Sequence, residues 1–346
     1  MEDLNQFVLE PGVIPPQFIK REIESNKIIE EFSSPSPSSH SYAILGPRGC
    51  GKTVLLNYIV EKLDNREGWI CANLNSKDDL LLQLAGALED KTAMRFPKLQ
   101  AEFSFSFSFM SLSLKGKEKV ADIHALLRRM METLHKHNYR VLVAIDDISL
   151  NEYVETFIKE FQLLRGQRFP IFLLTTGLYS AFNKIEEKDG ITFLQRSPKC
   201  YLGPLNMIQI KNSYRQVLKI SDEKAAKLAS FTKGYAFAYQ VLGYLLMKYN
   251  KKEIDEDIES MFDYFLEEGV YSRLYDELPK KEKEVVLYLS RNGESTNESL
   301  IASGVLNKDN ISYYKTSLAK RGVCDTSIRG RIDLALPRFA EYVLNR

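Results

Sequence analysis

The sequence has few of the features that mark secreted, membrane or metal-stabilised proteins. Its four cysteines show no C-x-x-C spacing, which argues against a zinc site and a disulfide framework. No apolar run approaches the length of a membrane span, and the acidic start Met-Glu-Asp-Leu-Asn does not suit a secretory signal. A net charge of +1 excludes a uniformly basic nucleic-acid protein. We therefore expect a cytoplasmic protein that makes no membrane contact.

The most informative stretch runs from Gly46 to Thr53 and reads Gly-Pro-Arg-Gly-Cys-Gly-Lys-Thr, a complete G-x-x-x-x-G-K-[ST] phosphate-binding loop. The apolar run before it is typical of a buried strand, and the residues from Val54 onward have helical spacing. Glycines let consecutive backbone N–H groups point inward, while the following helix presents its positive end to phosphate. The alternative is a glycine-rich turn that opens an ordinary helix.

The loop predicts a site for ATP and Mg²⁺. Lys52 is expected to reach the β- and γ-phosphates, and the Thr53 hydroxyl to bind the metal ion. Arg48 is either a phosphate contact or a solvent-facing arginine. We assign to the nucleotide the loop and the residue after it: Gly46, Pro47, Arg48, Gly49, Cys50, Gly51, Lys52, Thr53 and Val54.

A second motif supplies the acids that a phosphoryl-transfer site needs. Val-Leu-Val-Ala-Ile precedes Asp146 and Asp147, which predicts a strand buried on both faces with two carboxylates at its end, a Walker B pattern. We assign Asp146 to the Mg²⁺ water shell and Asp147 to the attacking water; the alternative is an acidic turn after a strand. Glutamate is the more usual second acid. Because aspartate is one methylene shorter, we expect slow hydrolysis that suits a switch.

Two further residues are candidates for the γ-phosphate. The run from Phe169 to Gly177 predicts another buried strand that ends in two hydroxyl residues, of which Thr176 is the candidate sensor; the alternative is that it satisfies the strand end. Arg196 precedes another apolar run and is either a γ-phosphate contact, in cis or from a neighbouring subunit, or a surface arginine.

The base is predicted to be adenine, because the guanine-specific pattern Asn-Lys-x-Asp fails at its fourth place at both Asn-Lys pairs. With the loop near the start, the acids about a hundred residues later and a hydroxyl-ended strand after them, the chain resembles AAA+ ATPases. It looks most like the STAND and origin-recognition-like ATP-binding proteins. The segment Pro11 to Glu22 is similar to the one that brackets adenine in them, and Gly234 to Gly243 to their lid helix, although Ala236 replaces the usual proline and Phe237 an arginine sensor.

The resemblance implies an α/β fold: a P-loop NTPase core with a parallel sheet of the AAA+ type, a helical lid and a C-terminal winged-helix domain. We place the core with its adenine-bracketing segment at residues 1–203, the lid at 204–275 and the winged helix at 276–346. The last third supports this order. Its pattern predicts helices over 282–292, 296–303 and 309–321, and then two strands about a turn at Arg329-Gly330.

The C-terminal part leaves two outputs open. From Val305 to Arg338 the local charge is 7 − 3 = +4, and a winged helix can bind double-stranded DNA through five candidates: Tyr313, Lys315, Thr316, Arg329 and Arg331. The alternative is a signalling or scaffold ATPase that binds a protein partner or forms an ATP-dependent homo-oligomer. The partner would bind the winged helix or the alternating Phe-Ser strand at 103–109. The alternative for that strand is a hairpin on the protein's own core. A small-molecule kinase is less favoured, because no substrate-binding segment is evident.

Overall fold

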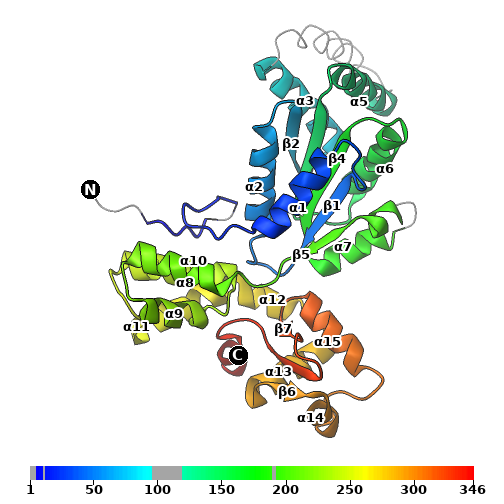
Figure 1. Cartoon of the computed structure of the whole chain (residues 1–346). Helices are drawn as coiled ribbons and strands as arrows, with labels where there is room; N and C mark the ends of the chain where they lie inside the picture. Colours follow the sequence, from blue (N-terminus) through cyan, green and yellow to red (C-terminus); the bar gives the residue numbers. More distant parts are fainter. Residues whose placement is uncertain (1–4, 11, 96–118, 189–191) are drawn as a thin grey trace. The chain divides into compact units, whose positions relative to one another are not determined.

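The structure is a computed structural model, and it describes residues 5–10, 12–95, 119–188 and 192–346 (Figure 1). The chain divides into two compact units. The sheet unit comprises Glu22–Leu45 and Leu55–Cys200, and the helical unit comprises Met1–Arg21, Gly46–Val54 and Tyr201–Arg346. The Phe-Ser segment lies outside the described residues. Among the helices of the described part, none has both the length and the apolarity needed to cross a bilayer.

The sheet unit is built on a five-stranded sheet in the order β2-β3-β4-β1-β5. Its strands pair in parallel from β2 to β3, from β3 to β4 and from β4 to β1, as Figure 1 shows. This confirms the predicted α/β fold with a parallel sheet. The strands span Ser41–Leu45 (β1), Trp69–Asn75 (β2), Arg140–Asp146 (β3), Ile171–Gly177 (β4) and Lys199–Tyr201 (β5).

Helices cover both faces of this sheet, which explains why β1 and β4 are buried along their whole length. On one face Phe32 of α1 packs against Tyr42 and Phe172. On the other, α3, α5 and α6 contribute to one apolar cluster with β1 to β4. The helices are Glu22–Ser33 (α1), Lys52–Asp64 (α2), Leu80–Arg95 (α3), Lys119–Lys136 (α5), Glu152–Gly166 (α6) and Tyr179–Glu186 (α7), followed by a 3-10 turn Thr192–Arg196.

His40, just before β1, is partly buried in the sheet unit. Its ring stacks on Phe172 with centroids 4.9 Å apart. Burial, helped by the positive charges of Arg165 and Arg140, lowers the pKa of His40 to about 4 from a usual value of 6.5.

We expect the stability of the sheet unit to fall as the pH drops from about 6.5 to about 4. In this window the unfolded chain protonates His40 and the folded chain does not, so acid favours unfolding. Urea titrations at several pH values should show a flatter pH dependence for His40→Gln than for the wild type. The exposed His137→Gln serves as control; equal slopes in all three proteins would contradict the prediction.

The segment predicted as a helical lid is helical and lies in the helical unit. Its helices include Met207–Leu218 (α8), Asp222–Phe231 (α9), Ala236–Lys248 (α10) and Glu256–Leu266 (α11). Side chains of Asn206, Ser221 and Asp255 accept backbone N–H groups at the start of α8, α9 and α11, so ordinary N-caps fix these boundaries.

The first residues of the chain belong to the same unit. Phe7 is buried against Tyr214 and Tyr239, and a side chain at Gly243 would collide with its ring. The Val8 N–H donates to Gln240 at 3.1 Å. An N-terminal segment therefore completes the core of the lid helices.

Residues 276–346 show the predicted order of three helices and two strands. The elements are Lys280–Asn292 (α13), Asn297–Ala302 (α14), Ile311–Lys320 (α15), Cys324–Asp325 (β7) and Arg331–Leu334 (β8). A further strand, Ser295–Thr296 (β6), completes a sheet in the order β6-β8-β7. We call residues 276–346 the C-terminal module; its designation as a winged helix stays a prediction.

The C-terminal module shares one apolar core with the lid helices. Between them lie a π-helical turn at Glu267–Tyr271 and α12, Ser272–Asp276. Arg338, the residue directly before the last helix Phe339–Leu344 (α16), donates to both carboxylate oxygens of Asp263 on α11. These acceptors raise the pKa of Arg338 above its already high value. The guanidinium is thus a permanent charged link between α11 and α16.

Candidate nucleotide site

The phosphate loop follows β1 directly and ends where α2 begins at Lys52. Gly49 and Gly51 have φ angles of +70° and +93°, in the region that favours glycine. At Gly46 an added β-carbon would lie 2.7 Å from Cys50 Sγ. The three glycines are therefore required by the path of the loop, as a phosphate cradle at a helix N-terminus demands.

Lys52 closes the loop on itself. Its Nζ donates to the carbonyl oxygens of Gly46 and Pro47, at 3.1 and 2.7 Å. Both are neutral acceptors, and a charged phosphate oxygen is a stronger partner for an ammonium group. The folded loop therefore holds the Lys52 ammonium group where a phosphate bound in the cradle can replace the two carbonyls as its hydrogen-bond acceptor.

Two side chains of the loop, Arg48 and Pro47, contact residues of the C-terminal module. The Arg48 guanidinium pairs with Glu277 at 2.8 Å, so the structure gives this arginine a carboxylate partner within the chain. Pro47 packs against Gly322, where an added β-carbon would lie 2.4 Å from the proline ring. Any side chain at position 322 would force this contact apart.

The acids lie at the end of β3, linked by one hydroxyl group. Thr176, fully buried at the end of β4, donates to Oδ1 of Asp146 and accepts the Asp147 N–H at 2.9 Å. Asp147 is exposed and has a φ angle of +48°. Thr176 thus orients both acidic residues, while the Asp147 carboxylate faces solvent.

The sheet order relates the acids to the end of β1. β4 lies between β3 and β1, and Leu45 is level with Gly177 in the pairing. Two strand spacings, about 9.5 Å, therefore separate the axes of β1 and β3. The acids thus lie at the carboxyl end of a strand that is the second neighbour of β1, the strand from which the phosphate loop continues in the sequence.

Arg196 ends the 3-10 turn and is exposed. Its assignment to the γ-phosphate stays a prediction.

The candidate DNA residues differ in how much they are engaged within the chain. Tyr313 is 68% exposed on α15, and Thr316 and Arg329 are also exposed. Lys315 is half-buried, which lowers its pKa, and it donates to Asn297 at 2.8 Å. Arg331 pairs with Glu294. Only part of the predicted basic surface is therefore available without breaking an internal contact.

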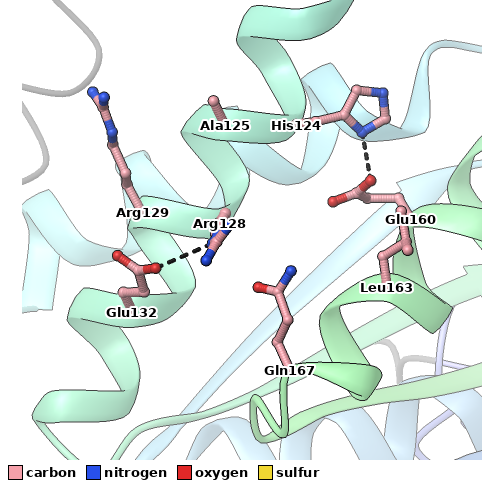
Figure 2. A pocket seen from close by; sticks show the side chains of 8 residues that line it. All are labelled: His124, Ala125, Arg128, Arg129, Glu132, Glu160, Leu163 and Gln167. Atoms are coloured by element: carbon pink, nitrogen blue, oxygen red, sulfur yellow. Dashed lines mark hydrogen bonds and ion pairs between the residues drawn. The ribbon is translucent and has the colours of Figure 1, made fainter.

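A separate groove of about 630 Å³ lies between α5 and α6 (Figure 2). Two pairs of its lining side chains interact: the buried Glu160 bonds to His124 across the groove, and Arg128 bonds to Glu132 along α5. None of the nucleotide or metal candidates is among the described residues that line it. The groove is thus unrelated to the predicted chemistry.

Residues 38–182 match the family model described as an AAA domain. The chain has the fold of origin-recognition-like AAA+ P-loop ATPases. The match spans the phosphate loop, both acids and Thr176, and the AAA+ fold with a complete loop implies nucleotide binding. The match to the family model thus agrees with the parallel sheet described above.

Three solved structures show this AAA+ fold over almost the whole chain. The Walker-type ATPase of Pyrococcus abyssi is 14% identical, with a TM-score of 0.65, and the match covers 98% of this chain and 99% of that one. The ORC2 protein of Aeropyrum pernix, solved as ADPNP-ADP complexes, is 15% identical, with a TM-score of 0.58 and coverage of 97% and 96%. Cdc6p from Pyrobaculum aerophilum is 16% identical, with a TM-score of 0.50 and coverage of 97% of both chains. No curated protein matches the sequence.

Three residues that contact the phosphate loop are not among those assigned from the sequence. Arg21 donates to the Cys50 carbonyl, the Tyr235 hydroxyl donates to the Arg48 carbonyl, and Glu277 pairs with the Arg48 side chain. Arg21 and Tyr235 stand within the adenine-bracketing and lid segments, so the resemblance pointed to the segments without their contacts. For Glu277 the sequence holds no signal.

Proposed function

We propose that the protein is an ATP-dependent molecular switch that binds ATP and hydrolyses it slowly. The observation that supports this best is the complete phosphate loop between β1 and α2, together with Asp146 and Asp147 at the end of β3, a strand of the same sheet as β1. In this proposal Lys52 binds the β- and γ-phosphates, Thr53 and Asp146 hold the metal ion and its water shell, and Asp147 orients the attacking water.

The donor set fits Mg²⁺ bound together with nucleotide. In the described part of the chain, no three His, Cys, Asp or Glu side chains gather into a metal-binding group, so phosphate oxygens would supply part of the coordination shell. When bound, Mg²⁺ neutralises charge that develops on the phosphates. Thr176 keeps Asp146 in one orientation, and we propose that it and Arg196 respond to the γ-phosphate.

Slow turnover is tested by single-turnover hydrolysis of ATP with Mg²⁺. We expect a rate below about 10 per second, the median for enzymes, because the Asp147 side chain is one methylene shorter than glutamate. The particle mass with ADP and with a non-hydrolysable ATP analogue should be measured on the same sample, because it decides between a monomer and an ATP-dependent homo-oligomer. No binding of ATP or ADP would contradict the proposal, and a rate above 10 per second would contradict its slow character.

For the output we propose that residues 276–346 form a winged helix that contacts double-stranded DNA. Support comes from the exposed Tyr313 and Thr316 on α15 and the exposed Arg329 in the turn between β7 and β8. The double change of Arg329 and Arg331 to Glu should weaken binding to a DNA duplex and flatten its dependence on salt by about two units of logarithmic slope. Changing Lys224 and Lys227 on α9 to Glu alters the net charge equally and serves as control. No duplex binding at low salt with ATP present would exclude this output.

A second output, contact with a protein partner, is favoured by the ion pairs of the C-terminal module. Arg331 pairs with Glu294 and Arg321 with the buried Glu282, which reduces the charge available to DNA phosphates. Tyr313 and Ile328 are 68% and 57% exposed. Exposed apolar side chains of this size suit a protein surface better than a phosphate backbone. Within either output, a cytoplasmic location and the absence of membrane contact remain part of the proposal.

A further inference from the structure

Three consecutive carbonyl groups of the phosphate loop are held from outside the loop. The Tyr235 hydroxyl donates to the Arg48 carbonyl at 2.5 Å. The Phe237 N–H donates to the Gly49 carbonyl at 3.0 Å. The Arg21 guanidinium donates to the Cys50 carbonyl at 3.2 Å. All of these residues belong to the helical unit, and we call the three donors the carbonyl clamp.

Because the peptide bond is planar, the carbonyl clamp also fixes the direction of the neighbouring N–H groups. In a trans peptide the carbonyl and the N–H of the same unit point in opposite directions, and the described chain has no cis peptide. Holding the carbonyls of residues 48, 49 and 50 outward therefore turns the N–H groups of Gly49, Cys50 and Gly51 the other way. Those N–H groups are the donors that a phosphate-binding loop offers to its anion.

The carbonyls nearer the start of the loop behave differently. Gly46 and Pro47 direct theirs to Lys52 Nζ. The direction of the carbonyl groups thus reverses between Pro47 and Arg48, where the carbonyl clamp begins. The positive φ of Gly49 lies within the clamped stretch, and an added β-carbon there would lie 2.4 Å from the Tyr235 hydroxyl. The loop backbone and the tyrosine are therefore fitted to each other.

The clamp is well placed to be rigid. Tyr235 is buried and burial raises the pKa of its hydroxyl well above the usual value, so the group stays a donor. It stands at the N-cap of α10, one turn before residues packed in the lid core. Arg21 also donates to the Gly203 carbonyl at 2.7 Å, which fixes its guanidinium independently of the loop.

We propose that Tyr235, with Arg21 and the Phe237 amide, is a positioning residue that pre-orients the phosphate-binding amides of Gly49, Cys50 and Gly51. The proposal rests on the proposed function, because it names what prepares that nucleotide site. It makes the start of α10 part of the phosphate site without any contact to phosphate. Movement of α10 would release the carbonyls and lower the affinity for the phosphates of the nucleotide.

The test compares two tyrosines of the same helix. Tyr235→Phe removes the hydroxyl that holds the Arg48 carbonyl, and Tyr239→Phe removes an equally buried hydroxyl that lies 2.5 Å from Ser213 in the lid core. ADP affinity is measured by titration calorimetry, and folding by thermal unfolding. We expect Tyr235→Phe to weaken ADP binding about 2- to 10-fold, the loss typical of one hydrogen bond, and Tyr239→Phe to leave it unchanged.

A second variant keeps the proposal open to refutation if one tyrosine change disturbs folding. Arg21→Met removes the donor to the Cys50 carbonyl, and it should also weaken ADP binding. Equal ADP affinity of the wild type, Tyr235→Phe and Arg21→Met, with all three folded, would overturn the clamp. If the wild type itself binds no ADP, the proposed function fails instead, so the two failures are distinguishable.

Discussion

Replacing Lys52 by alanine is expected to weaken ATP binding about 10- to 100-fold. Hydrogen bonds from a charged group contribute about 1.5–3 kcal/mol, and about 1.4 kcal/mol corresponds to a factor of ten in affinity. In the folded loop the ammonium group donates to the carbonyls of Gly46 and Pro47, which are not part of the carbonyl clamp, so its removal leaves the clamp intact. The loss should therefore appear in binding and not in folding.

The measurement is ATP titration by calorimetry, with thermal unfolding to check the fold. Lys62→Ala is the matched control, because Lys62 is an exposed lysine on the same helix, near its other end. We expect it to bind ATP like the wild type. If Lys52→Ala retained wild-type affinity, the loop would not be the phosphate site.

The second large effect concerns hydrolysis. Asp147→Asn is expected to lower the single-turnover rate about 100-fold or more, since a positioned base contributes about 10²–10⁴-fold. Asparagine is the best choice for this position because Asp147 has a φ of +48°, and asparagine tolerates that region as well as aspartate does. The backbone N–H that Thr176 accepts is kept, so ATP binding should change little.

Binding and turnover must be measured on the same sample to separate the two roles. Glu152→Gln, an exposed acid in the first turn of α6, is the control and should hydrolyse ATP at the wild-type rate. An Asp147→Asn protein that binds ATP normally and hydrolyses it as fast as the wild type would remove Asp147 from the mechanism. Loss of ATP binding as well would place it with the metal ligands.

The parts of the fold that the sequence predicts are those specified by neighbouring residues. The strand before Gly46, the helix after it and the strand that ends at Asp146 are each predicted from a short stretch of adjacent residues. All three lie where expected. β2 escaped prediction because polar residues at Asn73 and Asn75 interrupt its apolar pattern. Its pairing with β3 along the whole strand overrides that local signal.

The contacts around the site are harder to predict because they join residues far apart in the chain. Tyr235 lies 187 positions from Arg48, and Arg331 lies 37 positions from Glu294. No pattern of residue types links such pairs, so the clamp and the internal neutralisation of the basic surface emerge only from the structure. For the same reason the compact units group Met1–Arg21 and the phosphate loop with residues 201–346, and the predicted boundaries after 203 and 275 remain proposals.

The contacts of the N-terminal segment determine when it can fold during synthesis of the protein. The Val8 amide bonds to a side chain 232 positions later, and Asn5 to a carbonyl 239 positions later. At a translation rate of about 5–20 residues per second, Phe7 waits for about 12 to 48 seconds before α10 exists to bury it. During that time the sheet unit can fold, while Phe7 remains without its partner. The segment around Phe7 is thus synthesised well before the helix that buries it.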